Sequence, residues 1–254
     1  MGINCPVKTT ERDEMDQTTE RNKGFAGFCT RKQFEQLESI MVPMRIPTGG
    51  FLFWEGDDTE NIYYIRDGRV KLRKSTEDGK EYILTILQSG DLICENIGGN
   101  KALQYSYTAE VVETAEIGVI SRYALEALMQ HNADLALSFM NWMSLSQRVT
   151  QSKFRDLLLF GKPGALASTL IRLCNSYGIM EPYGIRIDMK LTHSELADFI
   201  GATRESVNRM LNEFKEEGIL DFRYGKIIVR QLKALQEICH CPSCPGCPGE
   251  VCRI

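Results

Sequence analysis

The sequence has 254 residues and a mass of 28.8 kDa, which suits two modest domains, and 43% of its residues are hydrophobic. Its formal net charge of −4 provides no overall positive field for nucleic acid, and no apolar run reaches the roughly 18 residues that span a bilayer. The first 24 residues are polar and lack the apolar segment of a secretion signal. We therefore expect a cytoplasmic protein that does not bind membranes.

Residues 1–24 are predicted to be a loose tail that leads into a short helix around Arg31–Ile40. From about Ile46 to Ile120, short apolar runs alternate with turn residues, mainly Gly and Asp. Strands that recur every 8–12 residues in this way are typical of an antiparallel barrel or sandwich. The expected strands are Phe51–Trp54, Ile62–Ile65, Val70–Arg73, Tyr82–Leu87, Thr108–Val112 and Ile117–Ile120.

The pattern becomes helical after Ser121, with a short helix at Tyr123–Gln130 and then a longer one that Asp134 is expected to cap. Apolar residues recur along the longer helix at steps of three and four and make a narrow seam, which consists of Leu135, Phe139, Trp142, Leu145 and Val149. Such a seam is typical of a helix that pairs with a second copy of itself. The alternative is a helix that packs on its own domain. The segment Gly161–Gly164 is expected to interrupt this helix at a domain boundary.

A further amphipathic helix at Ala165–Ser176 and a strand at Ile185–Met189 precede a predicted helix-turn-helix in Leu191–Leu220. Thr192 and Glu195 have the spacing of a capping box, Gly201 is expected to make the turn, and Thr203 is expected to cap the second helix. Its inner apolar face consists of Val207, Met210, Leu211 and Phe214, and its outer face near the N-terminus of Arg204, Glu205, Asn208 and Arg209.

A recognition helix presents its early positions to base edges in the major groove. Arginine there can donate a bidentate pair to guanine, and glutamate can accept from cytosine. Twelve basic and ten acidic residues between Thr150 and Arg230 give little electrostatic support, so an ordinary surface helix is the alternative. The segment from Gly218 to Val229 is expected to form a two-stranded wing.

Nine cysteines in a reducing compartment favour metal or redox sites over disulfides. Four are scattered, namely Cys5, Cys29, Cys94 and Cys174, whereas five lie in the last 16 residues, namely Cys239, Cys241, Cys244, Cys247 and Cys252. Thiolates separated by Gly and Pro turns can converge on one metal. Zinc could use Cys241, Cys244, Cys247 and Cys252 as a closed set. The Cys-Pro pairs favour an iron–sulfur cluster slightly, and a tail of free thiols is the remaining alternative.

This order of parts resembles the CRP/FNR family of bacterial transcription regulators over roughly residues 30–230, and Thr203–Arg209 looks like the recognition-helix motif of that family. The resemblance adds Thr203 and Ser206 to the expected DNA-binding residues. It implies an α+β fold with an N-terminal antiparallel β-roll or barrel like that of cyclic-nucleotide-binding domains, a long dimerisation helix and a C-terminal winged helix-turn-helix. The expected domains are residues 1–24, 25–130, 131–160, 161–232 and 233–254, the last being a cluster-binding extension.

Four segments resemble the Bacillus-type FNR branch of this family: Ser152–Leu159, Ser168–Leu173, Asn175–Gly178 and the tail Cys244–Cys252, which has the pattern C-x-x-C-P-x-E-[IV]-C. The resemblance implies an anaerobic regulator with a [4Fe–4S] cluster on Cys244, Cys247, Cys252 and Asp156. Without the resemblance, Asp156 would be interpreted as a solvated carboxylate near a helix end. The resemblance also implies a homodimer that reads a TGTGA-N6-TCACA-like palindrome and has RNA polymerase as a partner.

Two departures from the family matter. The stretch Asn100–Tyr107 lacks the arginine that holds a cyclic nucleotide's phosphate, although Glu95 stands where a ribose-binding glutamate would lie. We therefore expect no cyclic AMP binding. Cys5 and Cys29 are too sparse for the N-terminal cluster of the other FNR branch.

Two rival classes remain, a zinc-stabilised regulator that senses its signal through the barrel and an iron–sulfur redox enzyme. The absence of a nucleophile, a phosphate loop and a second cluster motif in the sequence disfavours the enzyme, and we expect no catalytic residues.

Overall fold

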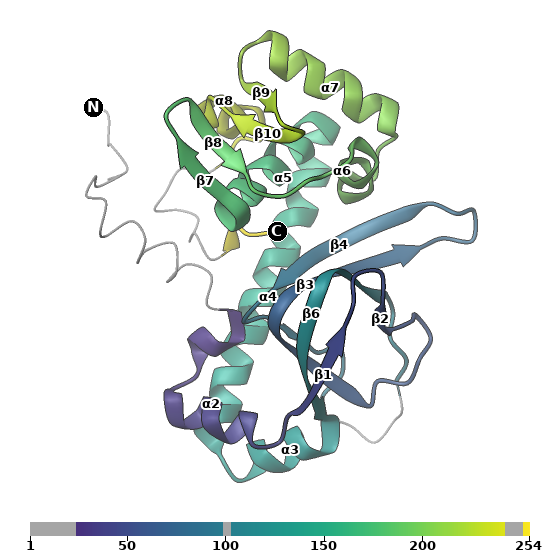
Figure 1. Cartoon of the computed structure of the whole chain (residues 1–254), viewed down its shortest axis with the longest axis vertical. Coiled ribbons are helices and arrows are strands. Elements are labelled where there is room, and N and C mark those ends of the chain that lie inside the picture. The colour runs from purple at the N-terminus through teal and green to yellow at the C-terminus, as the bar shows by residue number, and fades with distance from the viewer. Residues whose placement is uncertain (1–23, 99–102, 242–250) are drawn as a thin grey trace. The chain divides into compact units, whose positions relative to one another are not determined.

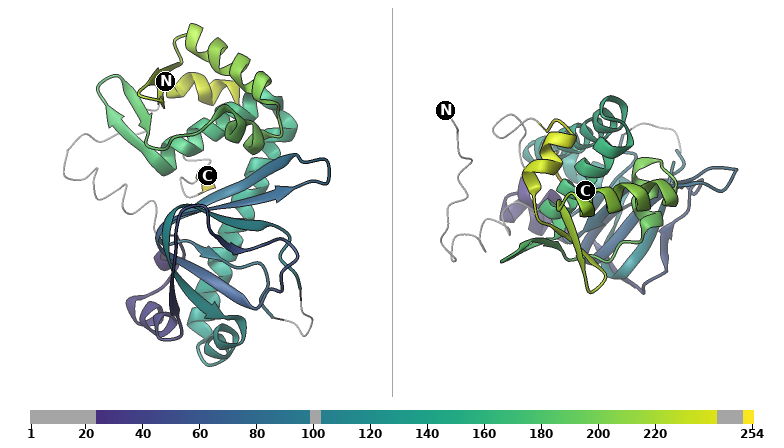
Figure 2. Two further views of the ribbon diagram at one scale, coloured as in Figure 1. Left: turned by 45° about the vertical axis from the view of Figure 1, so that its right-hand side comes forward. Right: turned by 90° about the horizontal axis from the view of Figure 1, so that it is seen from above.

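The computed structural model describes residues 24–98, 103–241 and 251–254. The chain divides into two compact units, and the division falls between Ser144 and Leu145, inside one long helix (Figures 1 and 2). Among the residues that the structure describes, no helix is both long and apolar enough to cross a membrane.

The first unit contains an antiparallel sheet in the order β1-β6-β3-β4, and β2 and β5 pair with β6 and β3 (Figure 1). Its elements are the 3₁₀ helix η1 (Gly24–Phe28), α2 (Arg31–Glu38), β1 (Val42–Ile46), β2 (Phe51–Phe53), β3 (Asn61–Ser75), β4 (Glu81–Gln88), β5 (Leu92–Ile93), β6 (Thr108–Ser121) and α3 (Arg122–Gln130). The antiparallel class is confirmed. The described strands do not close into a barrel, because β1 and β4 stand at opposite ends of the order.

Two predicted pairs of strands are single long strands, so the expected breaks are wrong. Gly68 lies inside β3 with a positive φ of 88°, where the register with β6 shifts. A Cβ atom at this position would lie 2.4 Å from the backbone oxygen of Thr114 on β6. The glycine therefore permits a bulge against the neighbouring strand instead of a turn. The runs Thr108–Val112 and Ile117–Ile120 likewise belong to one strand, β6.

The long helix α4 (Ala133–Leu159) is capped two residues earlier than expected. The side-chain oxygen of Asn132 accepts a hydrogen bond from the backbone N–H of Leu135 at 3.0 Å, and Asp134 lies in the first turn. Asn132 is therefore the N-cap, in place of Asp134.

The first three residues of the predicted seam are buried in the core of their own unit. Leu135, Phe139 and Trp142 are at most 8% exposed, and the rings of Phe139 and Trp142 meet the ring of Phe25 edge-on at centroid distances of 6.0 and 5.7 Å. These three residues thus match the alternative that the helix packs on its own domain. Leu145 and Val149, further along α4, are half-buried.

The second unit surrounds α5 with the winged helix-turn-helix elements. They are α5 (Gly161–Tyr177), β7 (Gly178–Glu181), β8 (Gly184–Ile187), α6 (His193–Ile200), α7 (Arg204–Glu216), β9 (Leu220–Arg223), β10 (Lys226–Val229) and α8 (Leu232–Ile238). The strands form an antiparallel sheet in the order β7-β8-β10-β9. The long helix is interrupted at Phe160, just before the predicted segment Gly161–Gly164, which itself forms the first turn of α5; Gly161 has a φ of +61°.

The sequence predicts an amphipathic helix at Ala165–Ser176, and this prediction is wrong: every residue of α5 from Gly164 to Cys174 is buried. Its neighbours include α6, α8, β7 and β8. A helix that is buried around its whole circumference forms the core of its unit and is not a surface helix.

Candidate functional site

The helix-turn-helix has the local geometry that the sequence predicts. The hydroxyl of Thr192 accepts from the backbone of Glu195 at 3.1 Å, and the carboxylate of Glu195 accepts from the backbone of Thr192 at 2.9 Å. Gly201 ends α6 in the left-handed conformation with φ of 59°, and Thr203 caps α7 by accepting from the backbone of Ser206 at 3.2 Å. Figure 1 shows α7 following α6 directly after this turn.

The two faces of α7 differ as expected. The inner residues Val207, Met210, Leu211 and Phe214 are buried, and the outer residues Arg204, Glu205, Asn208 and Arg209 are exposed. The side chain of Arg209 is 75% exposed, and its ion pair with Glu213 is long, at 3.9 Å. Its guanidinium is thus available for a ligand.

The predicted wing is the hairpin of β9 and β10. Tyr224 occupies its turn with a positive φ of 52° and is 96% exposed. Arg223 stacks over the ring of Tyr183 at 4.0 Å from its centroid, which ties the wing to the β7–β8 hairpin.

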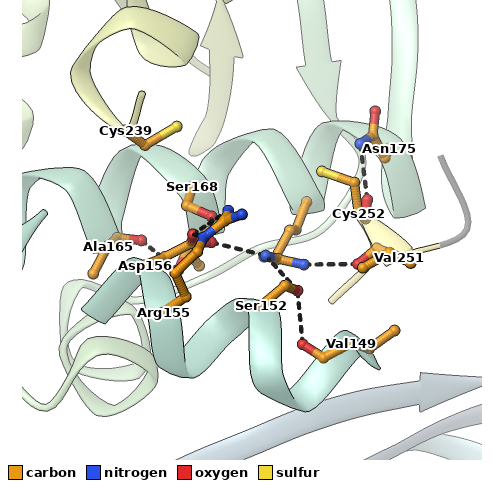
Figure 3. Close-up of polar contacts among 12 residues, drawn as sticks. Val149, Ser152, Arg155, Asp156, Ala165, Ser168, Asn175, Cys239, Val251 and Cys252 are labelled. Atoms are coloured by element: carbon orange, nitrogen blue, oxygen red, sulfur yellow. Dashed lines mark hydrogen bonds and ion pairs between the residues drawn. The ribbon is translucent and has the colours of Figure 1, made fainter. Parts of the chain in front are cut away.

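Asp156 is a buried ion-pair centre and not a solvated carboxylate. It is 3% exposed, and its Oδ1 accepts two hydrogen bonds from the guanidinium of Arg155, at 3.0 and 2.6 Å. Its Oδ2 accepts from the hydroxyl of Ser168 at 2.5 Å and from Nη2 of Arg172 at 2.8 Å (Figure 3). Burial opposes ionisation, but these donors outweigh it and hold the pKa of Asp156 below its ordinary value.

Arg172 connects Asp156 to the segment that carries Cys252. This arginine is 4% exposed, and its Nη1 donates to the backbone oxygen of Val251 at 2.9 Å. Its Nη2 donates to the hydroxyl of Ser152 at 3.0 Å as well as to Asp156. One guanidinium therefore joins α4, α5 and the segment that begins at Val251.

The predicted ligands are only partly described. Cys244 and Cys247 lie outside the described residues, and Cys252 is half-buried. In the described ranges, no group of three or more His, Cys, Asp or Glu side chains forms a metal site. Arg155 and Arg172 nevertheless place positive charge beside the carboxylate of Asp156. Positive charge also stabilises a cysteine thiolate, which is the form that binds iron. The chemistry of these groups therefore suits an iron–sulfur cluster.

The sequence groups Cys239 and Cys241 with the tail cysteines and gives Cys241 to a possible zinc site, but it does not predict that the two thiols pair with each other near Asp156. Cys239 is buried and hydrogen-bonded to Cys241, and this contact raises the pKa of Cys239. The same hydrogen bond, with help from Arg155 and Arg172, lowers the pKa of Cys241 to about 6. The C-x-C spacing of this pair was the only available signal. The importance of Arg172 had none beyond the resemblance of Ser168–Leu173.

In the first unit, the carboxylate of Glu95 is engaged within the protein. It accepts hydrogen bonds from the backbone N–H of Ser106 at 3.1 and 3.0 Å and from its hydroxyl. Of the arginine-free stretch Asn100–Tyr107, residues 100–102 lie outside the described part of the chain.

Two family models match the chain, the cyclic nucleotide-binding domain over residues 43–132 and the Crp-like helix-turn-helix domain over residues 164–238. An anaerobic regulatory protein of Bacillus subtilis (strain 168) is 42% identical over 222 residues, which are 87% of this chain and 92% of that protein. The cAMP-activated global transcriptional regulator CRP of Salmonella typhimurium is 30% identical over 186 residues, which are 73% of this chain and 87% of that protein.

Solved structures have the same fold. FixK2 from Bradyrhizobium japonicum matches with a TM-score of 0.67 at 18% identity, over 78% of this chain and 97% of that one. A CooA mutant from Carboxydothermus hydrogenoformans matches with a TM-score of 0.65 at 21% identity, over 80% of this chain and 89% of that one. At these identities the likeness concerns the fold alone.

Proposed function

Because the chain belongs to the CRP/FNR family of DNA-binding transcription regulators, we propose that it regulates transcription in response to oxygen through a [4Fe–4S] cluster on Asp156, Cys244, Cys247 and Cys252. It is a regulator and not an enzyme, as the sequence predicts. One observation carries the proposal: Arg172 binds both Asp156 and the backbone of Val251, next to Cys252. Arg172 is therefore in contact both with the carboxylate of Asp156 on α4 and with the segment that carries Cys252.

The cluster, when bound, supplies the sensitivity to oxygen. The protein supplies a carboxylate with a depressed pKa, which is ionised at neutral pH and can act as a ligand. A carboxylate offers about four acceptor positions, and Arg155, Ser168 and Arg172 occupy them with four hydrogen bonds. Asp156 must therefore release at least one donor before it ligates iron, and this exchange makes it the labile ligand of the set.

The DNA-reading residues follow from α7. We assign Arg204, Glu205 and Arg209 to base edges of a TGTGA-N6-TCACA-like palindrome, and Asn208 to the same exposed surface. Thr203 and Ser206 hold the N-terminus of the helix, where backbone N–H groups favour a DNA phosphate. Reading both halves requires a dimer whose recognition helices are about 34 Å apart.

The exposed apolar side chains of α4 supply the dimer surface. Leu137 and Met140 are each more than half exposed and, three residues apart, form an apolar stripe on the part of α4 that belongs to the first unit. Phe154 and Leu158 are likewise exposed on the part of α4 that belongs to the second unit. This stripe replaces the predicted seam, because Leu135, Phe139 and Trp142 are already in contact with their own unit. RNA polymerase remains the expected partner of the DNA-bound dimer.

Anaerobic purification followed by iron, sulfide and zinc analysis tests the cofactor. We expect about four iron and four sulfide per chain, as the [4Fe–4S] stoichiometry requires. Cys252→Ser and Asp156→Ala should lose most of the iron. Cys94→Ser is the matched control, since Cys94 lies in the other unit. One zinc per chain and no sulfide would support the zinc-stabilised regulator instead.

A further inference from the structure

The segment Val251–Ile254 is held on α5 by polar groups that α5 itself provides. Arg172 donates to the backbone oxygen of Val251 at 2.9 Å, and the side-chain amide of Asn175 donates to that of Cys252 at 2.8 Å. The backbone N–H of Ile254 donates to the hydroxyl of Ser176 at 3.1 Å. Figure 3 shows Asn175 pointing at the backbone of Cys252.

Apolar burial accompanies these hydrogen bonds. The side chains of Val251 and Ile254 are each 5% exposed, whereas Cys252 and Arg253 between them are half-buried. The two apolar side chains at the ends of this segment thus face the protein, and the backbone oxygen of Cys252 between them accepts from Asn175. Burial, with a smaller contribution from Cys252, raises the pKa of Cys174 on α5 to about 12.

We propose that Arg172, Asn175 and Ser176 form a docking site on α5 for the chain's own segment Val251–Ile254, which holds Cys252 against Asn175 and connects its segment to Asp156 through Arg172 without any cluster. Arg172 is a positioning residue in this arrangement. Its guanidinium reaches three acceptors in different directions, with Nη1 on the segment and Nη2 on Asp156 and Ser152. A lysine ammonium carries its three donors on a single nitrogen and would not span acceptors that two separate guanidinium nitrogens reach.

The shared guanidinium couples the two ends of the site. The carboxylate of Asp156 accepts hydrogen bonds from Arg155 on α4 and from Ser168 and Arg172 on α5. Removing its carboxylate leaves Arg172 without its buried counter-ion, so the arginine should reorient toward water and release Val251. Asp156 therefore controls the docked segment through Arg172.

This inference deepens the proposed function, but its test needs no cluster. Glu-specific protease is applied to the reduced, metal-free full-length protein, and mass spectrometry follows cleavage of the bond between Glu250 and Val251. The reference is a synthetic peptide of residues 245–254. Because Val251 must leave its buried position before the protease can act, we expect cleavage at least about tenfold slower in the protein than in the peptide.

Substitutions in the docking site identify which contacts protect the bond before Val251 from cleavage. Arg172→Lys, Asn175→Ala and Asp156→Ala should each raise the cleavage rate at least about threefold, each variant being checked by circular dichroism for an intact fold. Lys162→Ala, an exposed change on the same helix, should cleave like the wild type. If Arg172→Lys fails to fold, Asn175→Ala still tests the docking site, since it removes only the hydrogen bond to the backbone of Cys252.

The outcomes separate this inference from the proposed function. Wild-type cleavage as fast as that of the peptide would overturn the docking site, as would folded Arg172→Lys and Asn175→Ala variants that cleave at the wild-type rate. Faster cleavage in Asn175→Ala but not in Asp156→Ala would overturn the coupling through Arg172. Absence of iron in the purified protein would refute the cluster but leave the docking result unaffected.

Discussion

At the scale of single residues, Asp156 shows why the candidate site could be only partly predicted. Its partners Ser168 and Arg172 come from the next helix, and Arg172 reaches Val251 across 79 positions of sequence. No local pattern specifies contacts of that kind, so the sequence alone suggests a solvated carboxylate. The outer face of α7 was predictable because its exposure depends on helical periodicity, which is local.

Removal of the Asp156 carboxylate should destabilise the metal-free protein strongly. Asp156→Ala leaves Arg172 buried without its counter-ion, and we expect the free energy of unfolding to fall by about 3–5 kcal/mol. Urea denaturation followed by circular dichroism measures this difference. A loss below about 1 kcal/mol, the range of surface ion pairs, would contradict the buried ion pair.

The ion pair of Asp156 and Arg172 also predicts how the stability of the protein depends on pH. Because the folded pKa of Asp156 is lowered, its contribution is fully present above the unfolded value of about 3.9 and is lost as the pH falls through the folded value. The stability difference between wild type and Asp156→Asn should therefore be constant from pH 8 to pH 5 and shrink only in more acidic solution. A difference that disappears between pH 7 and pH 5 would show that the pKa is not depressed.

Recognition of bases by α7 can be tested at Arg209. Arg209→Ala should weaken binding to the palindrome by about 1–3 kcal/mol and reduce discrimination at one G·C pair. Fluorescence anisotropy with the palindrome, single-base variants and random DNA measures both effects. Equal weakening on every sequence would assign Arg209 to the phosphate backbone.

At the scale of elements, the helix-turn-helix was predictable and the long strands were not. The capping residues Thr192 and Thr203 and the turn at Gly201 act within a few residues of their own positions. Gly68 has the sequence appearance of a turn, but its role depends on β6, which passes close to its backbone. The apolar spacing of α4 predicted a helix correctly, yet spacing alone does not specify which surface covers it.

The stripe on α4 makes a specific prediction for dimerisation. Met140→Glu places a charge on an exposed apolar position of the stripe and should shift the protein toward monomers. Met180→Glu is the matched control, because Met180 is similarly exposed but lies on β7. Analytical ultracentrifugation across a concentration series compares the two. Dimerisation that both variants retain equally would exclude the stripe as the contact surface.

At the scale of the whole molecule, one chain contains a DNA-binding helix, a buried carboxylate and a cysteine segment. The unit that carries α7 also carries α5, Asp156 and the docked segment Val251–Ile254. A change in the partners of Asp156 is therefore a change inside the DNA-binding unit. This arrangement suits a switch in which loss of one ligand alters the population of the DNA-competent state.

The most direct test measures DNA affinity before and after exposure to air. Anaerobically purified protein is titrated against the TGTGA-N6-TCACA palindrome by fluorescence anisotropy at fixed salt, with the visible spectrum recorded in parallel. We predict that air bleaches the cluster absorption and weakens binding at least about tenfold, a loss of about 1.4 kcal/mol. Unchanged affinity after complete bleaching, or a colourless protein that binds equally well in both conditions, would contradict oxygen sensing through this site.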